Sequence, residues 1–272
     1  MTDLNLKDIT NQETYINKNH SSSNKKFSII ILAAGLGKRM NNPQFPKVMA
    51  QLAGRPLIGY VLETAGKLNP EKIVLIVGHG RELVIEYVTN LHLGNISFAV
   101  QEQQLGTGHA AAQAESDLSG FDGNVLILSG DVPMVQSNTL LEFIENHGLN
   151  EADASVLTTI APIPKGYGRV IRTQDGNFVK ITEDKDATEE EKQISEINSG
   201  IYFIKSPLLF SSLRELKNNN AQGEYYLTDI IEILRNKNYK VKACCLDAFD
   251  QMQGINTVAE LETLEAKLIT NY

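Results

Sequence analysis

Cysteine is scarce in this sequence of 272 residues, where Cys244 and Cys245 are the only two and are adjacent. Adjacent cysteines make neither an ordinary disulfide framework nor a metal site, which excludes a disulfide-stapled secreted domain. We expect both to be small, buried hydrophobic side chains in a strand-like segment. A chain of this length buries roughly three-quarters of its unfolded surface and needs no staple. The sequence therefore predicts a cytoplasmic protein.

Basic residues are in the minority. The chain has 25 lysines and arginines against 33 acids, which gives a formal net charge of -8. A general nucleic-acid binder shows a basic footprint, so we expect no nucleic-acid partner. A single nucleotide stays open, because a local cluster of cations decides its binding.

A long apolar run is also missing. The run at residues 27–36 follows two lysines and superficially resembles a signal-peptide core. It is too short to span a membrane. It also follows a polar segment that contains acids and leads into Lys38 and Arg39, so we expect neither export nor a membrane partner. Residues 1–26 are polar and without periodicity, which predicts a disordered tail.

The glycine loop at residues 32–40 lacks the features of two familiar phosphate-binding loops. A dinucleotide fingerprint needs a third glycine where Met40 stands. The Walker pattern needs a glycine where Leu32 stands, and a serine or threonine where Arg39 stands. We therefore predict neither a dinucleotide fingerprint loop nor a P-loop.

What the loop does contain favours a phosphate ligand. Gly35 and Gly37 follow an apolar strand-like run and permit a positive φ and a close approach to a ligand. Successive backbone N–H groups in such a turn form an anion-binding concavity. An ordinary strand-to-helix turn is the alternative. Arg39 and Lys47, close behind, favour a nucleoside triphosphate site.

Strand-like and helix-like segments alternate in the first half of the chain. Strands are predicted at 28–33, 72–77, 96–100 and 125–128, and helices at 57–68, 82–89 and 107–117, the last with Thr107 as a candidate N-cap. This alternation predicts an α/β fold with a mostly parallel, doubly wound sheet and helices on both faces. In such sheets the ligand lies beyond the carboxyl ends of the strands. Three segments fall there: the Gly35 loop, residues 101–108 and residues 129–131.

The second half changes character. Strand-like segments at 154–160, 168–171, 178–181 and 197–204 predict a mixed or antiparallel extension that covers the site. The charged stretch at 183–191 is predicted to be a loop, and 227–234 and 258–269 to be helices. We expect one domain over residues 27–272.

Two oxygen-bearing residues are candidates for a metal site. Asp131 ends a buried-looking strand after a glycine, and Asn256 offers a neutral oxygen. Mg²⁺ takes few protein ligands and completes its shell with water and phosphate oxygens, which suits both. The alternatives are a turn or N-cap aspartate at Asp131 and an N-cap for the last helix at Asn256. His109 is conceivable as a catalytic base, although packing or capping at its helix start fits better.

Nine ordered blocks, from about residue 27 to the C-terminus, carry a resemblance to a known family. They are LAAGLGKRM (32–40), FPKV (45–48), QEQQLGTGHA (101–110), GDVP (130–133), GYGR (166–169), EDKDA (183–187), EINSGIY (196–202), GEYYLTD (223–229) and GIN (254–256). Together they resemble the uridylyltransferase half of the bacterial bifunctional N-acetylglucosamine-1-phosphate uridylyltransferase/glucosamine-1-phosphate acetyltransferase family. So many blocks in order are far more specific than one glycine loop.

The resemblance implies a nucleotide-diphospho-sugar transferase fold of the glycosyltransferase-A-like type, with a role for each matching residue. The nucleotide would lie along Leu32, Ala33, Ala34 and Gly35, its phosphates held by the catalytic cations Arg39 and Lys47 and its uracil read by Gln101, Gly106 and Thr107. The sugar and its acetamido group would be held by Gly168, Glu183 and Asn198, and Mg²⁺ by Asp131 and Asn256. Residues 27–150 would then be the nucleotide-binding half, 151–250 the sugar-binding half, and 251–272 a closing loop and C-terminal helix.

The sequence also departs from the family pattern. It has no run of hexapeptide repeats for the acetyltransferase β-helix, so acetylation and the trimer built by that domain are not expected. Ser129 stands where some members have tyrosine, and Ser199 where many have threonine. Neither change removes a residue expected to bind a ligand.

The resemblance implies a Mg²⁺-dependent transfer of UMP from UTP to N-acetylglucosamine 1-phosphate, giving pyrophosphate and the cell-wall precursor UDP-N-acetylglucosamine. A phosphate monoester loses its second proton near pH 6, so the attacking oxygen needs no general base. The alternatives are a nucleotidyltransferase for another sugar 1-phosphate or nucleoside triphosphate, a non-catalytic sugar-nucleotide-binding regulatory protein, and a scaffold for a separate acetyltransferase. The oligomeric state stays open, with a monomer as one option.

Overall fold

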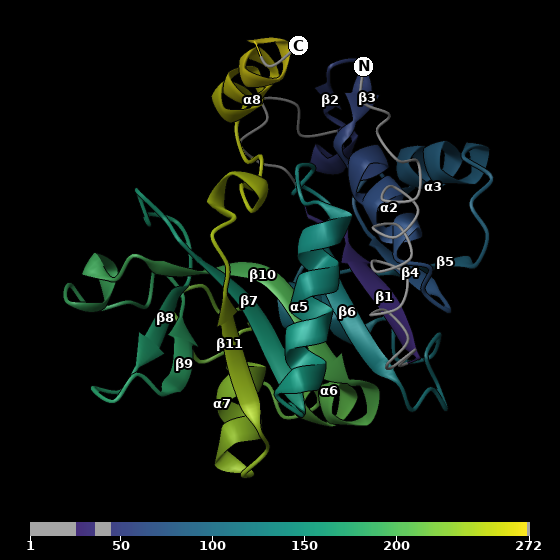
Figure 1. The fold of residues 1–272 in the computed structure, drawn as a ribbon. Helices are drawn as coiled ribbons and strands as arrows, with labels where there is room; N and C mark the ends of the chain where they lie inside the picture. The colour runs from purple at the N-terminus through teal and green to yellow at the C-terminus, as the bar shows by residue number, and fades with distance from the viewer. Residues whose placement is uncertain (1–25, 36–44, 271–272) are drawn as a thin grey trace, which may run out of the picture.

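A nine-stranded sheet forms the centre of the computed structural model, which describes residues 26–35 and 45–270 (Figure 1). Its main path runs β11-β7-β10-β6-β1-β4-β5, with β8 and β9 to one side. The strands are β1 (Phe27–Leu32), β4 (Ile73–Val77), β5 (Ile96–Val100), β6 (Asn124–Ser129), β7 (Ala154–Ile160), β8 (Arg169–Arg172), β9 (Phe178–Thr182), β10 (Glu196–Lys205) and β11 (Val241–Cys245), with β2 (Gln51–Leu52) and β3 (Arg55–Pro56) as a separate pair. The predictions for residues 1–25, Gly37, Lys38, Arg39 and Met40 lie outside the described residues.

The helices connect these strands. They are α2 (Leu57–Lys67), α3 (Arg81–Asn90), α4 (Thr107–Ala112), α5 (Ser137–Leu149), α6 (Ser206–Leu213), α7 (Asp229–Asn236) and α8 (Val258–Thr270), with short 3-10 helices η1 (Lys47–Met49), η2 (Glu191–Gln193) and η3 (Phe249–Gln251). None of the helices in the described part of the chain is both long and apolar enough to cross a bilayer.

The sheet is mostly parallel along its main path, as predicted. β1 pairs in parallel with β4 and β6, and β4 with β5. β10 lies antiparallel between β6 and β7, and β11 is parallel to β7. Because β10 opposes both of its neighbours, β6, β7 and β11 run in the same direction.

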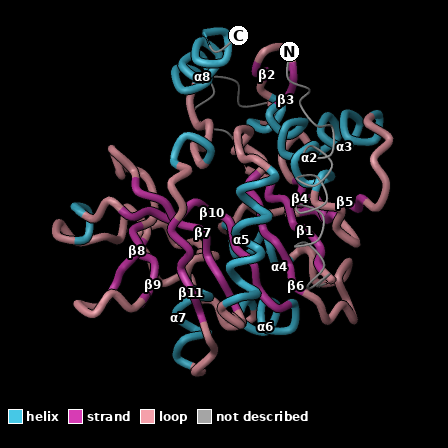
Figure 2. Tube along the Cα trace, in the orientation of Figure 1, coloured by secondary structure: helices cyan, strands magenta, loops and turns pink. Residues whose placement is uncertain are grey.

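Helices cover both faces of the sheet, because the buried strands alternate their side chains between two cores. On one face, Ile29 and Ile31 of β1 belong to a core that includes residues of α2, α3 and α5. On the other face, Ile30 belongs to a core that includes residues of α4, α6 and α7. Helix α5 crosses the front of the sheet in Figure 2, which makes this layering easy to follow. The α/β class with helices on both faces is therefore confirmed.

Three local expectations differ from the structure. The predicted helix 107–117 ends at Ala112, because the next N–H groups, of Gln113, Ala114 and Glu115, bond three residues back rather than four. Most strands of the second half join the main sheet, and only β8 and β9 leave its path. Cys245 is exposed and Cys244 only partly buried, because β11 is an edge strand.

Candidate active site

The strands end together at one edge of the sheet. Leu32, the last residue of β1, is in register with Ile76 of β4 and Ser129 of β6. Gly130 then donates its N–H to the carbonyl of Leu32 at 2.9 Å. A Cβ on Gly130 would lie 3.1 Å from that carbonyl, so a small residue keeps the strands close before the chain turns into Asp131. This edge is the one predicted to hold the ligand.

A polar cluster at this edge joins three segments that are far apart in the sequence. The ammonium of Lys47, at the start of η1, forms an ion pair with the carboxylate of Asp131. The same ammonium donates to the side-chain oxygen of Asn256 at 3.0 Å. The Lys47 and Asp131 side chains are only 15% and 20% exposed, so little water screens their attraction. The structure thus brings together three of the residues that the sequence singled out.

The backbone around Asn256 explains how its side chain reaches this cluster. Ile255 donates its N–H to the carbonyl of Asp131 at 3.0 Å, which fixes the loop before α8. Thr257 and Glu260 then form a capping box: each accepts the other's backbone N–H, at 3.0 and 3.2 Å. Since Thr257 caps α8, Asn256 is not its N-cap, and its carboxamide is available to Lys47. Asp131 is also no N-cap, because α5 begins only at Ser137.

The Mg²⁺ that the resemblance implies fits these oxygens. The Asp131 carboxylate and the Asn256 carbonyl oxygen both already face one cation, the Lys47 ammonium. Among the described residues, no group of three or more His, Cys, Asp and Glu side chains gathers to hold a metal. A metal with only these two oxygens would take its remaining ligands from water and phosphate, as Mg²⁺ commonly does.

The start of the glycine loop lies beside the end of β4. Ala33 and Ala34 are buried and Gly35 is exposed. Ala33 continues the ladder by donating to the carbonyl of Ile76 at 2.9 Å. Gly78 leaves the room for this loop, because a Cβ there would come within 2.9 Å of both Cβ and the carbonyl oxygen of Ala34. The described start of the loop, at residues 33–35, therefore lies close to the end of β4, and Arg39 lies outside the described residues.

The residues expected to recognise a base lie in a loop after β5 and at the start of α4, and hydrogen bonds hold them in place. Gln101 is buried, and its side-chain amide donates to the carbonyl of Gly106 at 3.1 Å. Its nitrogen also lies 2.9 Å from Nδ1 of His109. His109 therefore positions Gln101, in line with the packing role favoured over a catalytic base. Thr107 is the first residue of α4 rather than its N-cap, and its hydroxyl accepts from the N–H of Leu227 at 3.0 Å.

The segment around Tyr225 packs against this loop, and no role for it could be assigned from the sequence. The backbone of Tyr225 donates to Leu105 and accepts from Gly108, both at 2.8 Å. Gly106 has φ 113° and ψ 174°, a region essentially reserved for glycine. A Cβ on Gly106 would meet the Tyr225 carbonyl at 2.6 Å and its nitrogen at 2.8 Å. Residues 223–229 contribute to the family resemblance. Their contact with Gly106 could not be predicted, because the two segments lie more than 100 residues apart in the sequence.

The three residues expected to hold the sugar lie together: Gly168 comes just before β8, Glu183 comes just after β9, and Asn198 is on β10. A Cβ on Gly168 would come within 2.9 Å of Cγ2 of Ile181, and it would lie 3.6 Å from both the Asn198 Cβ and a carboxylate oxygen of Glu183. Asn198 donates its N–H to the Gly168 carbonyl at 2.9 Å and its amide to the Tyr202 hydroxyl at 2.8 Å. Gly168 therefore packs closely on Ile181, with Glu183 and Asn198 beside it.

The carboxylate in this corner is electrostatically unusual. Burial raises the pKa of Glu183, and the nearby Asp229, Asp186 and Asp184 raise it further, whereas a hydrogen bond from Thr228 at 3.1 Å lowers it. Burial also raises the pKa of Asp229 to about 6, with Glu232 and Asp186 adding to the effect. A carboxyl with a raised pKa favours hydrogen bonding with a neutral polar ligand over a second anion.

Comparison with known proteins identifies the family of this chain. Residues 28–250 match the family model described as nucleotidyl transferase. The chain is 44% identical over 236 residues to the bifunctional protein GlmU of Caldanaerobacter subterraneus subsp. tengcongensis. It is 42% identical over 227 residues to the bifunctional protein GlmU of a Listeria monocytogenes strain. These matches cover 87% and 84% of this chain but 50% and 49% of the relatives, so the chain spans about half the length of the curated relatives it matches.

Two solved structures share the fold. A putative glucose-1-phosphate thymidylyltransferase from Bacillus anthracis aligns with a TM-score of 0.69 at 21% identity, covering 88% of this chain and 94% of that one. A UDP-glucose pyrophosphorylase complexed with UDP-glucose aligns with a TM-score of 0.72 at 17% identity, covering 91% and 100%. At such identities the likeness concerns architecture alone.

The sheet and the polar cluster at its strand ends define an α/β protein with a site suited to a phosphorylated ligand. Within that class the chain belongs to the nucleotidyl transferase family, whose model spans most of its length. The resemblance to the uridylyltransferase half of the bifunctional family is likewise confirmed by the relatives named bifunctional protein GlmU.

Proposed function

We propose that this chain transfers UMP from UTP to N-acetylglucosamine 1-phosphate, releasing pyrophosphate and forming UDP-N-acetylglucosamine. The observation that carries the proposal is the meeting of Lys47, Asp131 and Asn256 at the carboxyl ends of the parallel strands. It is supported by the identity of 42–44% to GlmU proteins over most of this chain. A cation beside two oxygens of the kind that bind Mg²⁺ suits a reaction between two phosphorylated substrates.

Base selection rests on Gln101. Its nitrogen is held by Gly106 and His109, which leaves the side-chain carbonyl oxygen to accept a hydrogen bond. The N3 position of uracil carries a hydrogen and donates, whereas N3 of cytosine is an acceptor. This orientation therefore favours UTP over CTP, because a mismatched acceptor pair loses the bond and leaves both groups unpaired.

Sugar selection rests on the corner formed by Gly168, Glu183 and Asn198. Glu183 is an acceptor for sugar hydroxyls, and the Asn198 carboxamide suits the acetamido group of the substrate. The glycine matters because a Cβ at position 168 would meet Ile181 at 2.9 Å and lie 3.6 Å from each of these two residues, so a larger residue would displace them.

Catalysis in this site reduces to positioning and charge stabilisation. An oxygen of the sugar phosphate attacks the α-phosphorus of UTP in line, a new P–O bond forms, and the bond to the β-phosphate oxygen breaks with that oxygen keeping the electron pair. The attacking phosphate is already ionised near neutral pH, so no side chain needs to take a proton. Lys47 offsets the repulsion between the two anionic substrates and stabilises charge that develops at the transferred phosphoryl group.

Asp131 and Asn256 would hold Mg²⁺ in this site. When bound, Mg²⁺ supplies positive charge to the triphosphate oxygens and stabilises the pyrophosphate leaving group. Lys47 would then contact phosphate rather than the two side chains it now joins.

The decisive experiment is pyrophosphate release by the full chain with UTP and N-acetylglucosamine 1-phosphate in the presence of Mg²⁺. We expect turnover that requires both substrates and disappears with EDTA. A matched panel with glucose 1-phosphate, dTTP and CTP tests the identity of each substrate. Preference for glucose 1-phosphate or dTTP would assign a different nucleotidyltransferase activity, whereas UTP binding without turnover on any pair would contradict catalysis.

A further inference from the structure

The strand β10 contains a bulge beside the residues expected to hold the sugar. While β7 advances by one residue, from Thr158 to Leu157, its partner β10 advances from Asn198 to Ile201. Residues 199–200 therefore stand outside the register of this antiparallel pair. A bulge bends its strand and redirects the neighbouring side chains, and bulges are common next to active sites. The side chain that this bulge redirects is that of Asn198.

The residues of the bulge stabilise its unusual backbone. Gly200 has a φ of 80°, in the left-handed region that favours glycine. The Ser199 hydroxyl accepts from the N–H of Ile201 at 3.2 Å and donates to the carbonyl of Leu157 at 2.7 Å. These two bonds pair buried backbone groups at the point where the ladder is interrupted. The bulge is therefore a defined feature of β10.

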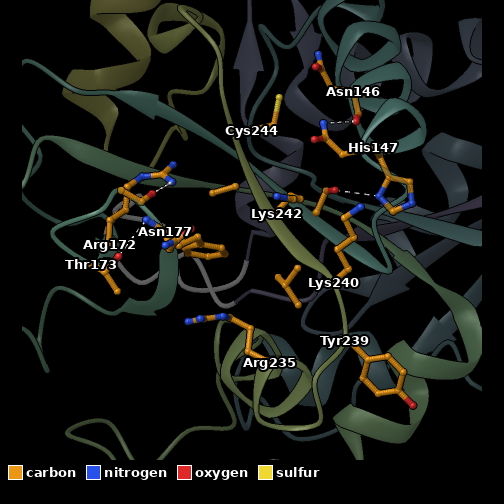
Figure 3. Close-up of a pocket in the computed structure, with 16 residues that line it drawn as sticks. Asn146, His147, Arg172, Thr173, Asn177, Arg235, Tyr239, Lys240, Lys242 and Cys244 are labelled. Atoms are coloured by element: carbon orange, nitrogen blue, oxygen red, sulfur yellow. Dashed lines mark hydrogen bonds between the residues drawn. The ribbon is translucent and has the colours of Figure 1, made fainter.

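The strand is held on both sides of the bulge. Before it, the carboxylate of Glu196 accepts from Arg172 at 2.6 and 2.7 Å, and Arg172 also lines a cavity beside β11 (Figure 3). After it, Tyr202 is in register with Ile127 of β6 and with Val156 of β7. The bulge and the side chain of Tyr202 thus keep a fixed position relative to the central sheet.

The carboxamide of Asn198 is fixed at both of its ends. Gly200 donates its backbone N–H to the side-chain oxygen at 3.0 Å, and the side-chain nitrogen donates to the Tyr202 hydroxyl at 2.8 Å. Because a backbone N–H can only donate, the first contact sets which end of the carboxamide is the oxygen. A carboxamide has two N–H donors and an oxygen that accepts twice, so one donor and one acceptor position stay available to a ligand. Asn198 is half-buried, which leaves it accessible from one side.

The bond to Asn198 also explains why residue 202 is a tyrosine. Tyr202 is only 1% exposed and belongs to an apolar core cluster. A phenylalanine would fill nearly the same volume, whereas a buried hydroxyl costs free energy unless it is hydrogen-bonded. Burial and the negative charge of Glu183 raise the pKa of Tyr202, so its hydroxyl stays neutral and remains available to Asn198.

We propose that Tyr202 is a positioning residue that selects the sugar through Asn198, an inference that rests on the proposed function. The fixed carboxamide presents an N–H and an oxygen side by side, which complement the carbonyl and the N–H of an acetamido group. The C2 hydroxyl of glucose presents a single oxygen, which cannot pair with both at good geometry. The bulge and Tyr202 therefore favour N-acetylglucosamine 1-phosphate over glucose 1-phosphate.

Steady-state kinetics of Tyr202→Phe with the two sugar phosphates test this proposal. We expect the KM for N-acetylglucosamine 1-phosphate to rise on the order of 10-fold, as for one lost hydrogen bond. The kcat, the KM for UTP and the KM for glucose 1-phosphate should stay close to the wild-type values, because the substitution leaves the phosphate and base contacts in place. Tyr60→Phe is the matched control, since its hydroxyl donates to the carbonyl of Leu52 at 2.8 Å and contacts none of the sugar-binding residues.

A double-mutant cycle separates positioning from general damage to the fold. In the Asn198→Ala background, Tyr202→Phe should not change the ratio of kcat/KM for the two sugars any further, because Tyr202 acts through Asn198. An unchanged ratio in Tyr202→Phe, or additive effects in the double variant, would overturn this inference and leave the proposed function intact. A wild-type preference for glucose 1-phosphate would contradict both.

Absence of turnover with every sugar phosphate would contradict only the proposed catalysis. Calorimetric binding of UDP-N-acetylglucosamine and UDP-glucose then measures the same selectivity in wild type and Tyr202→Phe. A smaller difference in affinity between the two UDP-sugars in the variant supports the positioning role, and an equal difference overturns it.

Discussion

At the scale of single residues, Lys47 is the side chain on which the proposed reaction depends most. Its ammonium contacts both Asp131 and Asn256, and it is largely shielded from water. A unit charge pair 4 Å apart is worth roughly 4 kcal/mol at an effective dielectric near 20, which is several times its value in bulk water. A reaction between two anions in this partly buried setting therefore depends strongly on each positive contact.

We expect Lys47→Ala to lower kcat/KM for pyrophosphate release by about 10²- to 10³-fold, as for a missing oxyanion donor. Asp131→Ala should lose at least as much, because it removes a carboxylate from the proposed Mg²⁺ site. Steady-state kinetics on variants with unchanged circular dichroism provide the measurement, with Lys217→Ala as the charge-matched control. Near-wild-type turnover in folded Lys47→Ala would contradict its assigned role.

Gln101→Ala tests base recognition. We expect it to reduce the preference for UTP over CTP, because the acceptor for uracil N3–H is lost while cytosine loses only a repulsive contact. The ratio of kcat/KM for the two nucleotides is the readout. His109→Ala should move the ratio in the same direction but less, because His109 acts only by positioning Gln101. Unchanged discrimination in Gln101→Ala would rule out base reading by this residue.

Individual candidate residues could be predicted where they follow a strand. Asp131 could be singled out because it follows a buried apolar strand, and the structure places it against Lys47. The choice between the two roles of Asn256 could not be made from sequence, since it depends on the capping box formed by Thr257 and Glu260. The contact of Tyr225 with Gly106 could not be predicted either, because neither segment contains a local sequence pattern that identifies the other as its partner.

At the scale of elements, the loop after β5 depends on the segment packed against it. Two backbone hydrogen bonds join Tyr225 to this loop, and Gly106 provides the required close approach. Strands with apolar runs of four or more residues, such as β1, β4 and β6, could be predicted to within a residue or two. The short pair β2–β3 and helices α5 and α6 were missed, because they have few residues or weak periodicity and are defined by tertiary packing.

We expect Gly106→Ala to lower the free energy of unfolding by about 2 kcal/mol or more and to raise the KM for UTP, because a methyl group there meets the Tyr225 backbone. Gly120→Ala is the matched control, since Gly120 also has a positive φ, of 74°, but nothing lies within 4 Å of its added Cβ. It should cost only about 1 kcal/mol of conformational strain. Chemical denaturation and UTP kinetics measure both effects, and equal costs at the two positions would refute the steric explanation.

At the scale of the whole molecule, the distribution of charge links stability to pH. Acids gather where α7 meets the end of β9, and the pKa of Asp229 rises there from 3.8 to about 6. The folded state then binds more protons than the unfolded state between these two values. Stability therefore falls as pH rises from about 4 to about 6 and stays lower above that range.

Asp229→Asn should remove this contribution. The difference in unfolding free energy between variant and wild type is expected to shift in favour of the variant by on the order of 1–2 kcal/mol between pH 4 and pH 7, after allowance for partial solvent screening. Urea denaturation at several pH values measures it. Asp122→Asn, at an exposed acid, serves as the control and should show no such trend. Parallel pH profiles for Asp229→Asn and wild type would contradict the assignment.

The position of β10 has a consequence for synthesis of the chain. β10 fills the gap between β6 and β7 although it is made after both. Until residue 205 emerges from the ribosome, the wholly apolar stretch Val125–Leu128 offers an open hydrogen-bonding edge to any neighbouring nascent chain. A stalled product ending before residue 196 should therefore need chaperone protection, and aggregation would begin at β6.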